Sequence, residues 1–141
     1  MPEPTDMMIL HLPVKARWYD MQESGEKPEE YREITPYWVK RLYQRKKEFA
    51  YAGPLTRDNA EYVCDPGLRY ILKGEGFKDI ELKPYTHVLF RYGYTRRTFI
   101  HRIDSITVGR GNPAWGAPED RDVFIIRHHK ETADWTPDRQ F

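Results

Sequence analysis

The charged run Ser24-Gly25-Glu26-Lys27-Pro28-Glu29-Glu30-Tyr31-Arg32-Glu33 separates two predicted helices. Within this run, a G-x-K-x-x-E-x-R pattern is filled by Gly25, Lys27, Glu30 and Arg32. A glycine after a helix indicates a turn, so we expect the run to turn and then continue as a strand. Alternate residues share one face of a strand, which places Glu30 and Arg32 on the same side, about 7 Å apart at their Cα atoms.

The chemistry of this pattern has two interpretations. A lysine, a carboxylate and a guanidinium that converge beside a glycine turn suit a polar ligand or a phosphate group. The same charges could instead form a solvated ion-pair strip, which contributes about 1 kcal/mol at most. Spacing alone leaves both interpretations open.

Upstream of the run, the sequence predicts a strand and a helix. The strand covers 8–14 and directs Ile9 or Leu10 toward the core. The helix covers 15–23, and Gly25 follows it where a left-handed residue commonly ends a helix. The predicted apolar stripe of this helix consists of Val14, Trp18 and Met21.

Downstream, a strand over 29–34 leads into a second helix. Thr35 is suited to cap this helix and Pro36 to occupy its first turn, and we expect the helix to continue to about Lys47. Its predicted apolar stripe consists of Trp38, Val39, Leu42 and Tyr43. Its other faces carry a locally basic set, namely Lys40, Arg41, Arg45, Lys46 and Lys47.

The remainder of the chain predicts further strands around a loop-rich region. Turn signals dominate 51–84, which we interpret as an insertion with one short element over 68–72. The predicted strands beyond it cover 86–92, 97–108 and 122–127, of which the last is apolar enough to be central. A polar tail over 131–141 follows. This order favours an α+β fold, a small and mostly antiparallel β-barrel with two N-terminal helices.

Composition places the chain among small globular proteins. Its 141 residues predict one domain, with core segments over 7–50 and 85–130. A net charge of +1 means that nucleic-acid binding would have to rest on local patches. Cys64 is the only cysteine, which excludes an internal disulfide and is typical of a reducing compartment. No apolar run approaches the roughly 20 residues that span a bilayer, and the N-terminus lacks a basic signal start. We therefore expect a cytoplasmic protein without membrane contact, and we assume a monomer.

The pattern and its flanks resemble a known family. G-x-K-x-x-E-x-R between a strand–helix unit and a second helix is similar to the signature of the ASCH domain family. Flanking residues that look like its small phage and bacterial members are Leu12-Pro13-Val14-Lys15, Tyr37-Trp38-Val39-Lys40-Arg41-Leu42, Val108-Gly109-Arg110-Gly111 and Pro113-Ala114-Trp115-Gly116. The resemblance covers the N-terminal third and the last two fifths of the chain.

The resemblance implies a PUA-like β-barrel, in a superfamily that chiefly handles RNA. It also implies a cleft beneath the barrel, lined by Lys27, Glu30 and Arg32. In this resemblance the Gly25 turn presents these three side chains to the cleft. Some small members are amidohydrolases that remove the acetyl group from acetylcytidine, using the motif lysine, a threonine and a later glutamate. This chain carries Glu30 at the position of that threonine.

Aromatic and basic residues extend the candidate ligand site. Aromatic rings can stack on bases, and arginines can contact phosphates. The candidates beyond the motif are Tyr31, Tyr37, Arg41, Arg91 and Trp115. For Trp18 we prefer core packing, and Trp115 could be either a ligand wall or a structural plug. The basic faces that include Arg45, Lys46, Arg96 and Arg97 could follow an RNA backbone or be simply solvated.

We expect no metal and no cofactor. The adjacent pair His128-His129 would face opposite sides of a strand, which is unsuitable for shared metal ligation. Cys64 lies beside a turn without a recognisable partner for a catalytic thiol.

Three functions are compatible with the sequence. The leading hypothesis is a module that binds RNA or a nucleotide. The first alternative is a hydrolase of a modified nucleoside or of RNA, with Lys27 as base or nucleophile, Glu30 as proton shuttle and Arg32 as electrostatic stabiliser. A carboxylate such as Glu30 keeps a nearby lysine charged, which favours binding over catalysis. The second alternative is a protein-interaction adaptor.

Overall fold

The computed structural model describes residues 7–64 and 78–131. These divide into two compact units built from alternating segments of the chain. Among the described residues, unit 1 comprises 7–30, 84–106 and 126–131, and unit 2 comprises 31–64, 78–83 and 107–125. The single-domain organisation stays a prediction.

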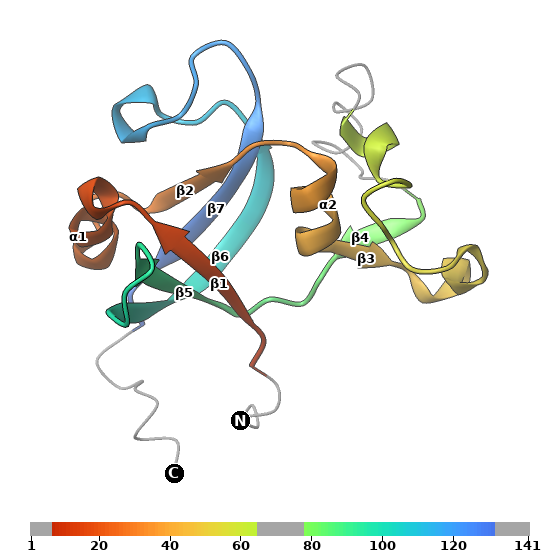
Figure 1. Cartoon of the computed structure of the whole chain (residues 1–141), viewed down its shortest axis with the longest axis horizontal. Coiled ribbons are helices and arrows are strands. Elements are labelled where there is room, and N and C mark those ends of the chain that lie inside the picture. Colours follow the sequence, from red (N-terminus) through yellow and green to blue (C-terminus); the bar gives the residue numbers. More distant parts are fainter. Residues whose placement is uncertain (1–6, 65–77, 132–141) are drawn as a thin grey trace. The chain divides into compact units, whose positions relative to one another are not determined.

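Five strands form one curled sheet in the order β1-β5-β6-β7-β2 (Figure 1). Their bounds are Ile9–Val14 for β1, Glu29–Arg32 for β2, His87–Tyr92 for β5, Thr98–Gly109 for β6 and Val123–His129 for β7. β1 pairs with β5 in parallel, β5 pairs with β6 in an antiparallel ladder, and the sheet is mostly antiparallel. The predicted α+β class and the central place of the last strand are confirmed.

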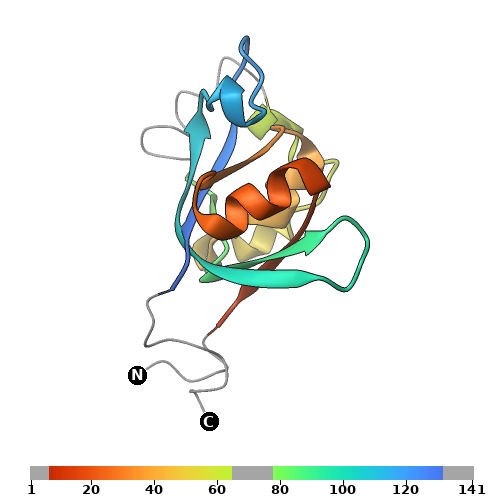
Figure 2. The ribbon, with the colours of Figure 1, turned by 90° about the vertical axis from the view of Figure 1, so that its left-hand side faces the viewer.

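The core of unit 1 follows from alternation along its strands. Leu10, Leu12 and Val14 of β1 are buried, and so are Val88 and Phe90 of the neighbouring β5. Alternate residues of a strand point to one face, so these side chains build a single apolar surface. Figure 2 shows helix α1 (Ala16–Ser24) lying against the concave side of these strands.

Helix α1 buries a different face from the predicted one. Its buried residues are Tyr19 and Gln22, whereas Trp18 and Met21 are only partly buried, so the predicted apolar stripe is wrong. Tyr19 packs edge-on against Phe99, with ring centroids 4.9 Å apart, so the face of α1 that carries Tyr19 is the one in contact with the sheet. The predicted end of the helix is confirmed, because Gly25 adopts a left-handed φ of 91°.

In unit 2, helix α2 is shorter than predicted. It spans Pro36–Leu42, and Thr35 caps it by accepting a hydrogen bond from Trp38 N, as expected. The predicted continuation to Lys47 is wrong, because the chain becomes extended at Tyr43 and forms strand β3 (Tyr43–Arg45). β3 pairs antiparallel with β4 (Ile80–Leu82), and pairing with a distant segment overrides the local helical propensity.

The region interpreted as an insertion contributes to the core of unit 2. Its start overlaps the end of the 3-10 helix η2 (Lys47–Ala52), and it contains the 3-10 helix η3 (Glu61–Cys64) and β4. Its buried residues are Leu55, Ala60, Val63 and Ile80. The short element predicted over 68–72 lies outside the described residues, as does the tail beyond 131. Among the helices that the structure describes, none is long and apolar enough to cross a membrane.

The loop after β6 closes over the ring of Tyr31. Asn112 N donates a hydrogen bond of 2.9 Å to the Tyr31 hydroxyl, and Asn112 also caps the short 3-10 helix η4 (Pro113–Trp115). A Cβ atom at Gly111 would lie 2.6 Å from Tyr31 Cε1 and 2.6 Å from Ala117 Cβ. Only glycine therefore permits this close approach of the loop to the ring.

Replacing Gly111→Ala should destabilise the fold by about 1–3 kcal/mol, because the added methyl group forces the ring or the loop to move. Urea denaturation followed by circular dichroism measures this loss. The matched control is Gly109→Ala, where the new Cβ meets Ile125 Cδ1 at an ordinary 3.6 Å. Equal effects of the two substitutions would show that the Tyr31 contact does not constrain the loop.

Candidate functional site

Lys27 and Glu30 form a buried ion pair in unit 1. The Lys27 side chain is 1% exposed and its Nζ lies 3.1 Å from Glu30 Oε1. The same ammonium donates a 2.7 Å hydrogen bond to the carbonyl of Glu29. Gln22 Nε2 of helix α1 donates to the same Glu30 oxygen at 3.2 Å. The Gly25 turn makes this possible, because it carries Lys27 back beneath α1, where Lys27 N donates to Met21 O at 2.9 Å.

Two buried histidines lie beside this pair. His101 of β6 and His128 of β7 are 2% exposed, and their Nδ1 atoms are 2.9 Å apart. Burial lowers the pKa of His101 to about 4, with a smaller contribution from the charge of His129. Burial, His101 and the charge of Lys27 lower the pKa of His128 to about 3. Both rings are therefore neutral at pH 7.

The two neutral rings share one hydrogen bond, in which one Nδ1 donates and the other accepts. Within the described ranges, two buried polar atoms of unit 1 have no hydrogen-bond partner, namely His128 Nε2 and Gln22 Oε1. The polar interior of unit 1 therefore holds two unpaired polar atoms.

Arg32, the last residue of the motif, belongs to unit 2. Its guanidinium lies over the Trp38 ring at 5.2 Å, and Arg41 approaches the same ring at 5.4 Å. Tyr37 packs edge-on against Trp38 with centroids 5.0 Å apart, and its hydroxyl accepts a 3.1 Å hydrogen bond from Arg41. The structure therefore brings together Arg32, Tyr37 and Arg41, three of the predicted site residues, around one indole.

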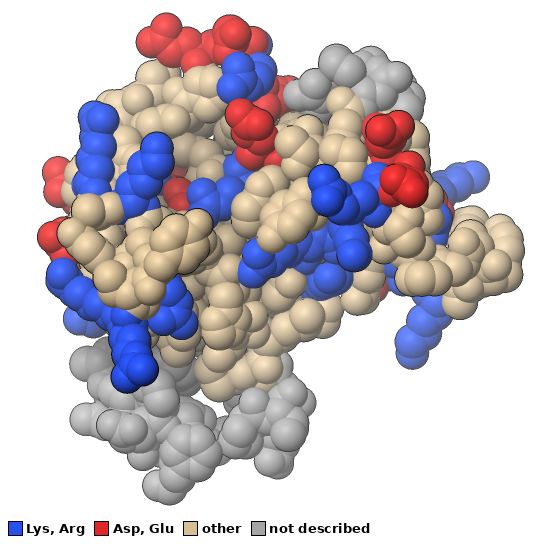
Figure 3. Space-filling model, in the orientation of Figure 1, with Lys and Arg blue, Asp and Glu red and all other residues tan. Residues whose placement is uncertain are grey.

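Like charges gather around this aromatic cluster. Burial lowers the pKa of the Lys83 ammonium, and the nearby charges of Lys40 and Arg41 lower it further. The contribution of Lys40 and Arg41 indicates that the positive charges of this region are not fully compensated by acidic groups. Figure 3 shows Lys and Arg side chains gathered over the region where Figure 1 places α2. This surface of unit 2 favours an anion.

A pocket of about 240 Å³ opens beside Arg32. Arg121 of the loop before β7 lies on its wall, 3.2 Å from the carboxylate of Glu33. The lining residues are Tyr31, Arg32, Glu33, Gly116, Pro118, Arg121 and Val123. The pocket therefore combines two guanidinium groups, one carboxylate and an aromatic side chain that the Asn112 loop holds in place.

The other predicted site residues have separate environments. Gly25 forms the helix-ending turn, and Arg91 donates a 2.8 Å hydrogen bond to Thr95 O in the β5–β6 turn of unit 1. Trp115 is partly buried in η4, next to the pocket residue Gly116. Arg45, proposed for an RNA track, instead makes a 2.6 Å ion pair with Asp79.

Several residues of these sites were not predicted from the sequence. Strand alternation, which buries His128 and exposes His129, was available as a signal for the buried histidine. Gln22 and His101 carry no comparable signal, because their burial depends on the rotation of α1 and on the pairing of β6. Arg121 and Glu33 are far apart in sequence, and only the tertiary structure brings them to one pocket.

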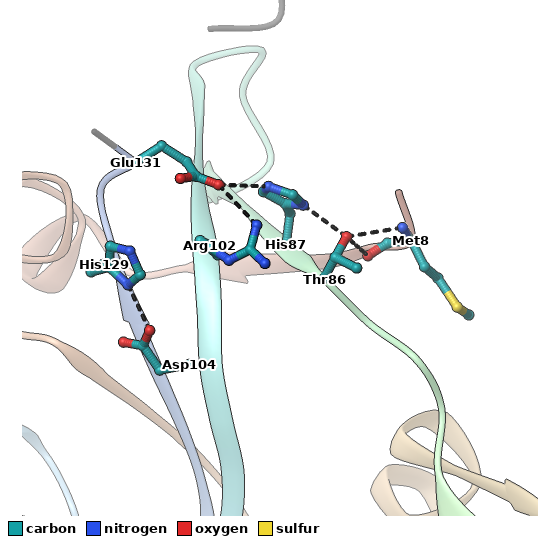
Figure 4. Close-up of polar contacts among 7 residues, drawn as sticks. All are labelled: Met8, Thr86, His87, Arg102, Asp104, His129 and Glu131. Carbon is teal, nitrogen blue, oxygen red and sulfur yellow. Dashed lines mark hydrogen bonds and ion pairs between the residues drawn. The ribbon is translucent and has the colours of Figure 1, made fainter. Parts of the chain in front are cut away.

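A third polar cluster joins Met8 and Glu131, near the limits of the described residues of unit 1, to the sheet (Figure 4). Thr86 Oγ1 bonds to the backbone of Met8, and His87 Nδ1 lies 2.7 Å from the same hydroxyl. His87 Nε2 and Arg102 both contact Glu131, at 3.2 and 3.3 Å. No group of three or more potential metal ligands occurs within the described ranges.

No family model matches the chain, and no match was found among curated proteins or solved structures.

Breaking the buried ion pair should cost far more than removing both partners. We expect Lys27→Met to lower the free energy of unfolding by about 3–5 kcal/mol, because it leaves the Glu30 carboxylate buried without its counter-charge. The double variant Lys27→Met/Glu30→Leu should regain much of this loss. Chemical denaturation measures both effects.

The control for this cycle is Arg121→Met, which removes an exposed ion pair and should change stability by less than about 1 kcal/mol. The single variant Glu30→Leu completes the cycle. If the double variant instead loses the sum of the two single effects, the pair is not coupled and its burial has no electrostatic consequence.

Acidification should destabilise the protein through the two buried histidines. Unfolded histidines take up protons below about pH 6.5, whereas the folded rings stay neutral down to pH 4 and 3. Stability is therefore full above pH 6.5 and should fall by about 2 kcal/mol per histidine between pH 7 and 5.

Denaturation curves measured at several pH values test this dependence. His128→Gln should flatten the pH profile, because it removes one of the two buried rings. A profile of His128→Gln that is as steep as that of the unmodified protein would contradict the role of His128.

Proposed function

We propose that the chain is an ASCH-type, PUA-like module that binds RNA or a nucleotide through the pocket of unit 2. The observation that carries this proposal is the position of Arg32. Its guanidinium lies on the pocket wall and is held over the Trp38 ring at 5.2 Å. An arginine stacked in this way is oriented before a ligand arrives, so less conformational freedom is lost on binding.

The pocket offers partners for each part of a nucleotide. Arg32 and Arg121 supply planar guanidinium groups, which can bind a phosphate through two parallel hydrogen bonds. Glu33 can accept a hydrogen bond from a base amine. The volume of about 240 Å³ is below the range of about 300–1,000 Å³ that is common for drug-sized ligands, so the pocket would enclose part of a nucleotide and leave the rest in solvent.

The buried half of the motif has a supporting role in this proposal. Lys27 donates to Glu29 O and to Glu30, and its side chain is 1% exposed. As base or nucleophile in a hydrolase, Lys27 would have to reach the substrate and lose a proton beside a carboxylate. For both reasons we prefer ligand binding to hydrolysis of a modified nucleoside as the function. The positive charge around α2 similarly favours an anionic ligand over a neutral protein partner.

Calorimetric titration with the four ribonucleoside monophosphates, and fluorescence anisotropy with short labelled RNAs at low salt, test the proposal. We expect Arg32→Ala/Arg121→Ala to weaken binding at least tenfold, because each lost charge-assisted contact removes about 1.5–3 kcal/mol. The single variant Arg121→Ala should give a partial loss and, being exposed, should not disturb the fold.

The matched control is Arg102→Ala, which removes an arginine of similar exposure from unit 1 and should bind as the unmodified protein does. The proposal fails if no ligand binds at low salt, or if the pocket variants and the control bind equally well.

A further inference from the structure

We propose that the β5–β6 turn and the start of α1 form a second contact surface, specific for single-stranded nucleic acid. This hairpin surface consists of Lys15, Arg17, Arg91, Tyr94, Arg96 and Arg97, all in unit 1. The inference rests on the proposed function only for the class of ligand, because none of these residues lines the pocket of unit 2.

Positive charge dominates the hairpin surface. Five of its six residues are lysine or arginine, and two acidic side chains, Asp20 and Glu23, lie near Tyr19 beneath Arg97. Asp20 is engaged by Arg97 at 3.1 Å. The side chains of Lys15 and Arg96 are exposed and have no hydrogen-bond or ion-pair partner within the described ranges. These cations are available to phosphate groups without first breaking an existing ion pair.

The turn also presents an isolated aromatic ring. Tyr94 is 98% exposed, the highest value among the large hydrophobic residues that the structure describes as exposed. Gly93, with a φ of 56°, reverses the chain just before it. Thr95 fixes the turn, because its amide and its hydroxyl both donate to Tyr92 O, at 3.0 and 2.6 Å. Tyr94 is therefore held in solvent by a well-bonded backbone and not by a frayed segment.

Specific contacts hold the turn against helix α1. Gly93 N donates a 2.8 Å hydrogen bond to Val14 O, one residue before Lys15. The Arg97 guanidinium lies 4.8 Å from the ring centre of Tyr19, in addition to its ion pair with Asp20. The cations of α1 and of the turn therefore belong to one surface of unit 1, and the lower left of Figure 3 shows Lys and Arg side chains gathered there.

Single-stranded nucleic acid matches this combination better than a protein does. Every base offers a face that can stack on Tyr94, while a flexible backbone lets successive phosphates reach the surrounding cations. A protein interface would need an apolar centre, whereas Tyr94 is the only large hydrophobic residue of unit 1 that is fully exposed within the described ranges. A duplex would keep its bases stacked inside and away from the ring.

Anisotropy of a labelled twelve-nucleotide oligouridine tests the proposal across a series of salt concentrations. We expect Tyr94→Ala to weaken binding about fivefold to hundredfold, as is typical for the loss of one stacked base. Arg96→Ala should lower the salt slope by about 0.7, the value for one lost phosphate contact on a single strand. Both side chains are exposed, so neither variant should disturb the fold.

The matched control is Tyr51→Ala, which removes an exposed tyrosine of unit 2 and should leave affinity unchanged. Equal affinities of Tyr94→Ala and Tyr51→Ala would overturn the proposal. So would a loss of binding with Arg96→Ala that Tyr94→Ala does not share, because that result indicates a general polyanion or an acidic protein as partner. Equal affinity for a duplex of the same length would also overturn it.

Mononucleotide titrations separate this proposal from that of the pocket. Tyr94→Ala and Arg96→Ala should bind nucleoside monophosphates as the unmodified protein does. If no monophosphate binds while oligouridine binds in a Tyr94-dependent way, the pocket proposal fails and the hairpin surface stands. If monophosphates bind but oligouridine binding is independent of Tyr94, the proposal for the hairpin surface fails and the pocket proposal stands.

Discussion

The burial of a single ammonium group constrains much of unit 1. A lysine that is 1% exposed has lost its hydration, and this loss is tolerable only when a counter-charge and hydrogen-bond acceptors replace the water. Glu30 supplies the charge and the Glu29 carbonyl supplies a further acceptor. Glu30 can reach Lys27 only if the chain turns back after α1, which requires the left-handed Gly25. Gln22, on the helix itself, donates a further hydrogen bond to the Glu30 carboxylate.

The same constraint divides the charged motif into two chemical roles. Lys27 and Glu30 satisfy each other in the interior of unit 1, so their charges have little effect on an external ligand. Arg32 has its guanidinium on an indole ring and on the wall of a pocket in unit 2. A motif that looks uniform in sequence therefore combines a buried structural pair with one residue that lies on a pocket wall. The histidines next to the pair stay neutral, because a second buried cation beside Lys27 would be strongly unfavourable.

Local signals predicted the elements, but not their faces or partners. The strand predicted over 8–14, the Thr35-Pro36 cap and the Gly25 turn each depend on short-range chemistry, and the structure confirms all three, with β1 over Ile9–Val14. The end of α2 depends on β4, which lies beyond 78 in the sequence, so local propensity misplaced it by several residues. The buried face of α1 is the one that meets Tyr92 and Phe99, and the pocket wall includes Arg121 and Glu33, which are far apart in sequence. Such contacts are set by the tertiary fold and produce no periodic pattern of residues in the sequence.

The pairing of sequence-distant strands in unit 1 has a consequence for how the protein acquires its structure. β1 lies parallel to β5, and Thr86 bonds to Met8 across 78 positions of the chain. Arg127 joins Glu29 across 98 positions. Contacts of such long sequence separation form slowly, because a large loop must close before they are made. During synthesis β1 and α1 emerge from the ribosome before their partners, so their apolar faces stay uncovered until β5 and β6 have emerged. The ion pair of Lys27 and Glu30, only three residues apart, is available from the start.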